Sequence, residues 1–206
     1  MRVYKNKLEE KLSRRIKVII MSESIRSFLA IDIDADLLDK IKTVEDEFKK
    51  IDANIKYVNI ENMHLTLKFF GNIDLNMIDK ISCSVKKVIN EHKPFKINIK
   101  GLGAFPNTKQ IKVIWIGLEE NKDLIKLQKN LDNEFNKLGF NIERNYKSHL
   151  TIGRMKNGKN KNLIQDKIKE YEDYNIGSMT VKKIALKKST LTPQGPIYEN
   201  IEVFKL

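Results

Sequence analysis

The stretch Asn62–Phe70 reads NMHLTLKFF, and its His-Leu-Thr-aliphatic core recurs in Lys147–Arg154, which reads KSHLTIGR. The two histidines, His64 and His149, are far apart in the chain and are two of only three in it. Successive side chains of a β-strand point to opposite faces. Each copy therefore predicts a strand that anchors its leucine-type side chains in a core and presents a histidine and a threonine on the other face.

The alternation of polar and apolar residues assigns each side chain to a face. In the first copy, His64, Thr66 and Lys68 are predicted to share the outward face. The apolar residues of that copy are predicted to face the core together: Leu65, Leu67 and Phe69. In the second copy, His149 and Thr151 share a face opposite two aliphatic residues. Each copy can therefore supply half of a two-histidine site.

Length and composition indicate a globular protein. The 206 residues suit one compact domain or two closely joined lobes, with 41% hydrophobic and 32% charged residues. No apolar run approaches the roughly 18 residues that cross a bilayer, so we expect no membrane association. The only cysteine, Cys83, cannot form an internal disulfide, which fits a cytoplasmic location, and we interpret it as a structural residue.

The formal net charge of +12 has two interpretations. A basic surface attracts a polyanion such as RNA by steering and counterion release. The alternative is a lysine-rich solvated surface with no such partner. Together with a site suited to phosphate, the charge favours a nucleic-acid substrate.

The order of predicted elements indicates an α+β fold of two related lobes. Residues 1–24 are expected to be an N-terminal extension, with Met21 as an alternative start, and residues 25–206 a single bilobal domain. Besides the two histidine strands, strands are expected at residues 26–33, 55–60, 95–102, 111–118, 181–191 and 197–204. Helices are expected at residues 35–51, 75–91, 122–138 and 163–171. A turn is expected at residues 103–107.

Two histidines facing one another favour proton-transfer chemistry. The unperturbed pKa of histidine is about 6.5, so one imidazole can accept a proton while the other donates one. The threonines Thr66 and Thr151 place hydroxyl donors beside them, which suits the oxyanion that develops at a pentavalent phosphorus. Acyl transfer fits less well, because no serine or cysteine stands in a recognisable nucleophile turn.

A metal site is the main chemical alternative. The sequence has no His-x-x-x-His motif, no cysteine pair and no acidic residue on the histidine faces, so we expect no metal and no cofactor. A single histidine strand is easily explained by a histidine that is hydrogen-bonded within a sheet. Two matching copies make that explanation weak. His92 has no such partner and is interpreted as a surface or capping residue.

These residues resemble those of a known family. The two His-x-Thr-x copies look like the paired signatures of the two-histidine (2H) phosphoesterases, and most closely those of the RNA 2′,3′-cyclic phosphodiesterases, long called 2′-5′ RNA ligases. The resemblance covers residues 25–206. Besides the second histidine motif, five segments carry it: RSFLAID at 26–32, NMHLTLKFFG at 62–71, GLGAFP at 101–106, VIW at 113–115 and KSTLTPQGPIY at 188–198.

The resemblance implies a bilobal fold with two pseudo-symmetric antiparallel sheets, helices on their outer faces and a central cleft. It implies opening of a 2′,3′-cyclic phosphate at an RNA end, without metal or ATP, to leave a 2′-phosphate. His64 and His149 would be the acid/base pair, and Thr66 and Thr151 would bind the phosphate. Arg154 matches a basic family position, but its strand parity is opposite to that of His149, so Gly153 must end or kink the strand.

The resemblance leaves several points open. Ser189 and Phe105 are candidates for the cleft wall, with turn and core roles as their alternatives. Which histidine is acid and which is base is not written in the sequence, because the motifs are nearly symmetric. A 5′-hydroxyl in place of water would give a 2′-5′ link. The expected partner is RNA with 2′,3′-cyclic ends, tRNA fragments among the candidates, bound by a monomer. The alternatives are an RNA-binding module without turnover and a phosphodiesterase for another cyclic phosphate or a 2′-5′ oligonucleotide.

Overall fold

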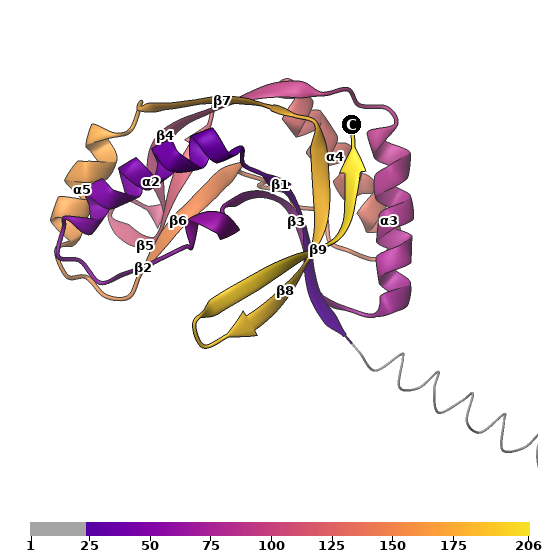
Figure 1. Cartoon of the computed structure of the whole chain (residues 1–206), viewed down its shortest axis with the longest axis horizontal. Helices are drawn as coiled ribbons and strands as arrows, with labels where there is room; N and C mark the ends of the chain where they lie inside the picture. Colours follow the sequence, from indigo (N-terminus) through magenta and orange to yellow (C-terminus); the bar gives the residue numbers. More distant parts are fainter. Residues whose placement is uncertain (1–23) are drawn as a thin grey trace, which may run out of the picture.

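The computed structural model describes residues 24–206, which form two antiparallel sheets with helices on their outer sides (Figure 1). Of the predicted N-terminal extension, residues 1–24, only Ser24 is among the described residues, so Met21 lies outside them. One sheet has the order β3-β1-β8-β9, and the other has the order β2-β6-β5-β4-β7. Every pairing within them is antiparallel. The predicted α+β fold with two related sheets is confirmed.

The two histidine strands lie in different sheets. The strands of the first sheet are β3 (His64–Ile73), β1 (Ile25–Asp32), β8 (Lys183–Thr192) and β9 (Gly195–Lys205). Those of the second are β2 (Ile55–Tyr57), β6 (His149–Met155), β5 (Gln110–Leu118), β4 (Phe95–Asn107) and β7 (Asn175–Val181). Each sheet therefore supplies one copy of the His-Leu-Thr motif.

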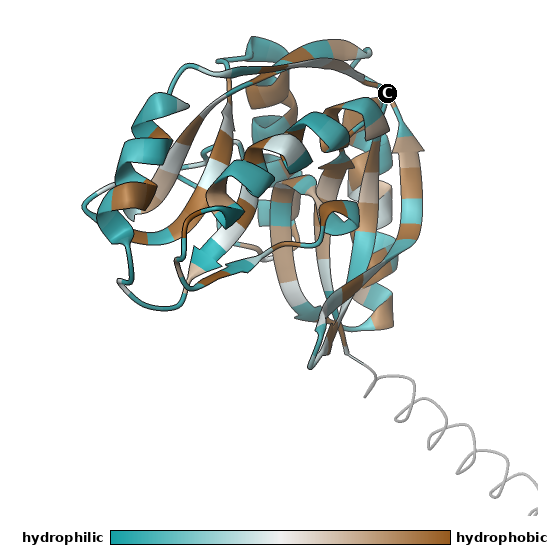
Figure 2. Cartoon of the chain, turned by 60° about the vertical axis from the view of Figure 1, so that its left-hand side comes forward, coloured by the Kyte–Doolittle hydropathy of each residue, from teal (hydrophilic) through white to brown (hydrophobic). Residues whose placement is uncertain are grey.

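Amphipathic helices cover the outer faces of the sheets (Figures 1 and 2). The described helices are α2 (Ala35–Lys49), α3 (Leu75–Ile89), α4 (Lys122–Lys137), α5 (Lys161–Glu170) and the single turn η1 (Ile60–Asn62). Helix α3 packs against α4 and β9, whereas α2 packs against β7 and α5 against β4. Their apolar stripes merge with the inner strand residues into one buried core, and no described helix has the length and apolarity to cross a membrane.

Helix starts follow the predicted capping residues in part. The Asp74 carboxylate accepts a hydrogen bond of 2.8 Å from the Met77 amide at the start of α3, as expected of an N-cap. Asp34 does precede α2, but its side chain makes no capping bond. Gly139 follows α4 with a φ of +95°, the left-handed backbone that a helix end favours in glycine.

Strand β4 is longer than predicted. The turn expected at residues 103–107 is instead its last part, and the hairpin to β5 lies at Thr108 and Lys109. Gly103 is directly opposite Trp115, and a Cβ atom on it would lie 2.2 Å from the indole ring. The glycine is therefore needed for close packing of a side chain within the sheet and does not mark a turn.

Strand β7 is missing from the predicted elements, and the strand expected at residues 181–191 is β8, which begins two residues later at Lys183. Ile176 lies between two β7 residues that pair with adjacent residues of β4, so it is an extra residue in this strand pair. The regular alternation of side chains between the two faces of β7 is therefore broken. Ile176 and Met179, three residues apart, are both buried. A period-two pattern cannot detect a strand that contains such a bulge.

The structure also places two residues on or just after α3. Cys83, interpreted from the sequence as a structural residue, has an exposed side chain and does not belong to the buried core. His92 lies just beyond the helix, where its Nε2 atom is 3.3 Å from the side-chain amide nitrogen of Asn130 on α4. It is a part-buried residue between two helices, far in sequence from both motifs.

Candidate active site

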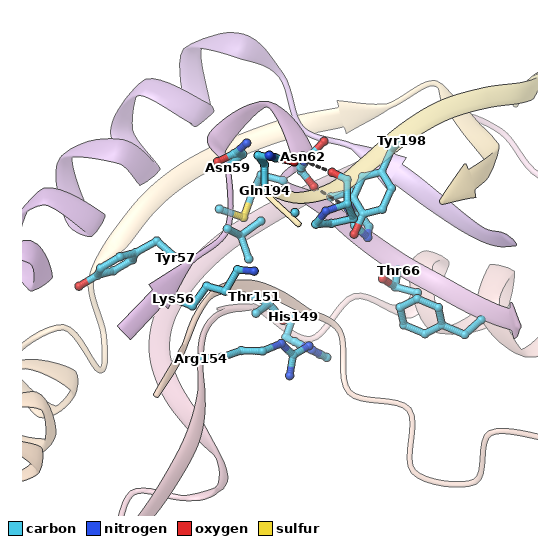
Figure 3. Close-up of a pocket in the computed structure, with 16 residues that line it drawn as sticks. Lys56, Tyr57, Asn59, Asn62, Thr66, His149, Thr151, Arg154, Gln194 and Tyr198 are labelled. Atoms are coloured by element: carbon cyan, nitrogen blue, oxygen red, sulfur yellow. Dashed lines mark hydrogen bonds between the residues drawn. The ribbon is translucent and has the colours of Figure 1, made fainter. Parts of the chain in front are cut away.

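One cleft of about 330 Å³ is lined by both histidine strands (Figure 3). All five residues singled out from the sequence line it: His64, Thr66, His149, Thr151 and Arg154. Residues from β2, the η1 region and the β8–β9 turn complete its wall. Two motifs that are distant in the chain are therefore brought to a single site by the packing of the two sheets.

Arg154 reaches the cleft because β6 contains a bulge. Thr151 is opposite Trp115 and Gly153 is opposite Ile114, so Ile152 is an extra residue between them. An extra residue reverses the parity of everything that follows it. Arg154 therefore lies on the face of His149. The strand does not end at Gly153, since β6 continues to Met155, and the irregularity expected there is the bulge at the preceding residue, Ile152.

Strand β3 contains a bulge at the equivalent place. Thr66 is opposite Ala30 and Lys68 is opposite Leu29, so Leu67 is the extra residue. The predicted faces of the next two residues are consequently wrong. Lys68 is buried, whereas Phe69 is 62% exposed and lines the cleft.

The two bulges extend the pseudo-symmetry of the site beyond the shared motif. Each bulge lies three residues after a histidine, and each returns the residue five positions after that histidine to the cleft. These residues are Phe69 in the first sheet and Arg154 in the second. One sheet therefore offers an aromatic ring where the other offers a guanidinium, so the cleft has an apolar side and a cationic side.

Both imidazoles are oriented by the backbone. The Nδ1 atom of His64 is 2.7 Å from the carbonyl oxygen of Asn62, and the Nδ1 atom of His149 is 2.7 Å from that of Lys147. A carbonyl oxygen only accepts, so Nδ1 carries the proton in each ring. The Nε2 atom of each neutral imidazole is left free to accept a proton.

The two histidines have different surroundings. The ring of His64 packs against Phe28, with centroids 4.7 Å apart, and against the edge of Tyr198 at 5.3 Å. The ring of His149 meets Phe105 edge to face at 4.9 Å. Phe105 is thus beside the cleft, and Ser189 is not among the lining residues but lies opposite Tyr198 in the β8–β9 ladder.

Burial lowers the pKa of His64 below its usual value, and the backbone carbonyl of Asn62 partly opposes this effect. The two residues of a nearby ion pair act on the pKa of His64 in opposite directions. The Lys187 ammonium is 2.8 Å from the Asp32 carboxylate, and Asp32 is directly opposite His64 in the β1–β3 ladder. Lys187 lowers the pKa of His64 and Asp32 raises it. Asp32 ends the segment 26–32 that carried part of the resemblance, whereas nothing in the sequence marks Lys187 as a site residue.

The structure adds further lining residues to those found from the sequence. Lys56 is opposite Arg154 in the β2–β6 ladder, and Figure 3 shows the two side chains next to one another. Gln194 and Tyr198 come from the β8–β9 hairpin, inside the segment 188–198 that carried part of the resemblance. That segment was a usable signal for them, whereas nothing in the sequence marks Lys56. Within residues 24–206, no three His, Cys, Asp or Glu side chains gather as metal ligands would.

A buried ion pair connects the first histidine strand, β3, to α4 and to the segment that precedes the second histidine strand. The Lys68 ammonium contacts the Asp132 carboxylate of α4 and the carbonyl oxygen of Asn141. Asp132 also accepts a hydrogen bond of 2.6 Å from the amide of Glu143. The segment between α4 and His149 is therefore anchored to β3 from within the core.

Comparison with known proteins agrees with this geometry. A model of the LigT-like phosphoesterase family matches residues 31–115 and again residues 116–198, and each match contains one histidine motif. An RNA 2′,3′-cyclic phosphodiesterase of Methanothermobacter thermautotrophicus is 43% identical over 88% of this chain and 99% of its own. The RNA 2′,3′-cyclic phosphodiesterase of Methanocaldococcus jannaschii is 42% identical over 86% of this chain and 99% of its own. Two solved structures share the fold. Thermus thermophilus TT0787 has a TM-score of 0.76 and 22% identity, over 88% of this chain and 98% of its own. Escherichia coli LigT has a TM-score of 0.73 and 21% identity, over 89% of this chain and 98% of its own.

Two antiparallel sheets that each bring a His-x-Thr strand to one cleft define a two-histidine phosphoesterase. The chain belongs to the LigT-like phosphoesterase family, as the twofold match of the family model and the archaeal relatives show. It is accordingly a phosphodiesterase by family.

Proposed function

We propose that this protein hydrolyses 2′,3′-cyclic phosphate ends of RNA to 2′-phosphates by two-histidine acid/base catalysis. The observation that carries the proposal is a single cleft in which both imidazoles are held by backbone carbonyls with Nε2 free. The relatives from Methanothermobacter and Methanocaldococcus bear the name of this activity, and their matches cover 88% and 86% of this chain.

In the proposed reaction, water attacks phosphorus while one imidazole takes its proton. The bond from phosphorus to the ribose 3′-oxygen breaks, and the other imidazole, which starts the reaction as an imidazolium with a proton on Nε2 as well, donates that proton to the oxygen. The phosphate therefore stays on the 2′-oxygen. His64 and His149 are the two groups proposed for these proton transfers, each of which contributes on the order of 10²–10⁴-fold.

Three side chains are proposed to bind the phosphate oxygens. The hydroxyls of Thr66 and Thr151 stand two residues after the histidines and line the same cleft. The Arg154 guanidinium, brought to that face by the bulge in β6, suits an oxyanion that gains charge in the transition state. Lys56, opposite Arg154, adds a second positive charge on this side.

The apolar side of the cleft is proposed to hold the terminal nucleoside. Phe69 presents an exposed ring there, and both Phe69 and His64 pack against Phe28. Bases stack on exposed aromatic rings in a sequence-tolerant way. Escherichia coli LigT, which shares this fold, has been crystallised with 3′-AMP, so a nucleotide is a ligand of that protein. The basic net charge of +12 suits a longer RNA strand.

We expect Phe69→Leu to weaken substrate binding more than chemistry. Leucine keeps apolar volume but removes the stacking face, which is worth about 1–3 kcal/mol per base. KM for a 2′,3′-cyclic mononucleotide should therefore rise about tenfold or more while kcat changes little. Steady-state kinetics give both constants. Ile197→Leu, at another exposed apolar position in β9 outside the cleft lining, serves as the matched control.

The pH dependence should reflect the surroundings of His64. Because burial lowers its pKa, His64 loses its proton at a lower pH than an ordinary histidine. The limb of the kcat/KM profile that reports His64 should therefore lie below pH 6.5; it is the acid limb if His64 is the base and the alkaline limb if His64 is the acid. Lys187→Met removes a charge that opposes protonation of His64, so that limb should move to higher pH. Asp32→Asn removes the compensating charge and should move it to lower pH. Shifts in the same direction would contradict this assignment.

A direct test is to incubate the protein with an RNA oligonucleotide that ends in a 2′,3′-cyclic phosphate and to identify the product. We expect a 2′-phosphate, resistant to enzymes specific for 3′-phosphates, and unchanged activity in excess EDTA. A 3′-phosphate product, or activity lost in EDTA and restored by one metal, would refute the proposed mechanism. Binding without turnover would instead support an RNA-binding module.

We further propose that the protein acts as a monomer in the cytoplasm, on RNA ends that include tRNA fragments. Every residue assigned to the cleft comes from one chain, so a second copy is not needed for a complete site. The lone cysteine suits a reducing compartment. Light scattering and cell fractionation test the first two points, and sequencing of captured RNA ends tests the third.

A further inference from the structure

The face of the first sheet that carries His64 continues beyond the catalytic cleft. Alternate residues of a strand share a face. Phe28 of β1 is on this face, because its ring packs against the ring of His64 with centroids 4.7 Å apart. Arg26 is two residues earlier in β1, so it shares the face and is about 6.6 Å farther along the strand. Arg26 is exposed and is not among the residues that line the cleft.

Strand pairing places further polar residues level with Arg26. Asn72 of β3 is directly opposite Arg26 and is exposed on the same face. On the other side, the register of β1 with β8 makes Ser189 level with Arg26. Tyr198 of β9 is opposite Ser189. These residues form one row across all four strands of the sheet, which we call the outer row: Asn72, Arg26, Ser189 and Tyr198.

The outer row carries a positive charge that is not neutralised by an ion pair. None of the ion pairs among residues 24–206 includes Arg26. Lys187, on the same face of β8, is already paired with Asp32. Burial raises the pKa of Tyr198, and the guanidiniums of Arg154 and Arg26 act in the opposite direction. The charge of Arg26 therefore acts on a residue of the cleft wall, as that of Arg154 does.

The chemistry of the substrate decides which of its groups faces the outer row. In the proposed function the cyclic phosphate lies between the histidines and the base stacks on Phe69. A ribose whose 2′- and 3′-oxygens are held at the histidines directs its 5′-oxygen away from them. Phe69 and Phe28 are opposite one another and lie between His64 and the outer row. In an RNA chain, the 5′-oxygen that leaves the cleft over these rings carries the phosphodiester to the preceding nucleotide.

We propose that the outer row binds this phosphodiester through the Arg26 guanidinium, the Asn72 amide and the Ser189 hydroxyl. The proposal rests on the proposed function and deepens it, since it makes a linked RNA chain a better substrate than a free cyclic mononucleotide. A guanidinium binds phosphate oxygens through paired, charge-assisted hydrogen bonds. Contacts to the phosphate carry no information about the base, so the preference is independent of RNA sequence.

The test compares three substrates that share one cyclic end. They are adenosine 2′,3′-cyclic phosphate, the same compound with a 5′-phosphate, and a 3′-5′-linked diadenosine that ends in a 2′,3′-cyclic phosphate. We expect Arg26→Gln to lower kcat/KM about tenfold or more for the two substrates that carry the additional phosphate, as loss of a charge-assisted hydrogen bond does. Hydrolysis of adenosine 2′,3′-cyclic phosphate should stay within about twofold of the unchanged protein.

The dependence on salt gives a second measurement. For the dinucleotide, Arg26→Gln should make the slope of log kcat/KM against log salt concentration less steep by about 0.7, the contribution of one phosphate contact in a single strand. Asn72→Asp places a negative charge in the outer row and should reproduce the selective loss by a different route. Circular dichroism confirms that each variant is folded.

Arg144→Gln is the matched control, because it removes the same charge from another exposed arginine, which lies outside both the cleft lining and the outer row. Net charge is therefore the same in both variants. Arg144→Gln should leave the hydrolysis of all three substrates unchanged, which separates a contact with the phosphate from a general effect of charge on RNA binding.

Other outcomes would overturn the proposal. An equal loss with all three substrates in Arg26→Gln would mean that Arg26 acts on the cleft they share, and no loss would mean that it binds no phosphate. A loss confined to the dinucleotide would assign the outer row to the preceding nucleoside and not to the phosphate. Failure of the unchanged protein to hydrolyse any cyclic end refutes the proposed function itself. Hydrolysis of all three substrates with equal kcat/KM refutes only this inference.

Discussion

Replacing either His64 or His149 with alanine should abolish nearly all hydrolysis of a 2′,3′-cyclic RNA end while the protein stays folded. Each imidazole is proposed to make one of the two proton transfers, and loss of such a group costs on the order of 10²–10⁴-fold. Neither ring fills the core, because both line the cleft. Initial rates at saturating substrate, together with thermal unfolding, measure the two effects separately.

The double variant sharpens this prediction. Groups that act as a unit give strongly non-additive losses, so the double variant should be much less impaired than the product of the two single losses. His92→Ala changes the third histidine, which lies between α3 and α4, and should retain full activity. Retention of more than a few per cent of activity by either cleft variant would exclude a paired mechanism.

The second large effect concerns the buried pair of Lys68 and Asp132. Lys68→Met should destabilise the protein by about 3–5 kcal/mol, because it leaves the Asp132 carboxylate buried without its partner. Lys87→Met breaks an exposed pair with Glu134 between α3 and α4 and should cost less than about 1 kcal/mol. Urea unfolding of both variants gives the comparison.

The double replacement Lys68→Met with Asp132→Leu separates stability from positioning. Apolar replacement of a whole buried pair is often neutral or stabilising, so the double variant should regain much of the lost stability. It still lacks the bonds to the Asn141 carbonyl and the Glu143 amide that anchor the segment before His149. We therefore expect kcat to remain low in a stable protein. Recovery of both properties together would show that the pair has only a structural role.

Most elements could be predicted because their patterns are local. The helices begin at the predicted residues or within two of them, since an apolar stripe with period 3.6 and a polar cap are visible within about fifteen residues. The two histidine strands and the two-sheet α+β class were likewise predicted correctly. Repetition of a rare residue in one short motif was sufficient to identify the candidate site.

Three of the errors share a cause that no local pattern contains. Lys68, Phe69 and the strand β7 were misassigned because a bulge adds one residue opposite a neighbouring strand. Whether a residue is extra depends on which strand lies beside it. For β3 that strand is β1, which precedes α2 in the chain, and for β7 it is β4, with both α4 and α5 in between. The alternation within a strand carries no information about that register.

By itself, the sequence determined the two motifs, the amphipathic elements that hold them and the chemistry their side chains can perform. The tertiary structure decided which side chains after each motif enter the cleft. A strand alternates faces with a fixed period of two, and only pairing with another strand can shift that period by one residue. The bulges at Leu67 and Ile152 make this shift in both sheets, and they turn Phe69 and Arg154 toward the two histidines.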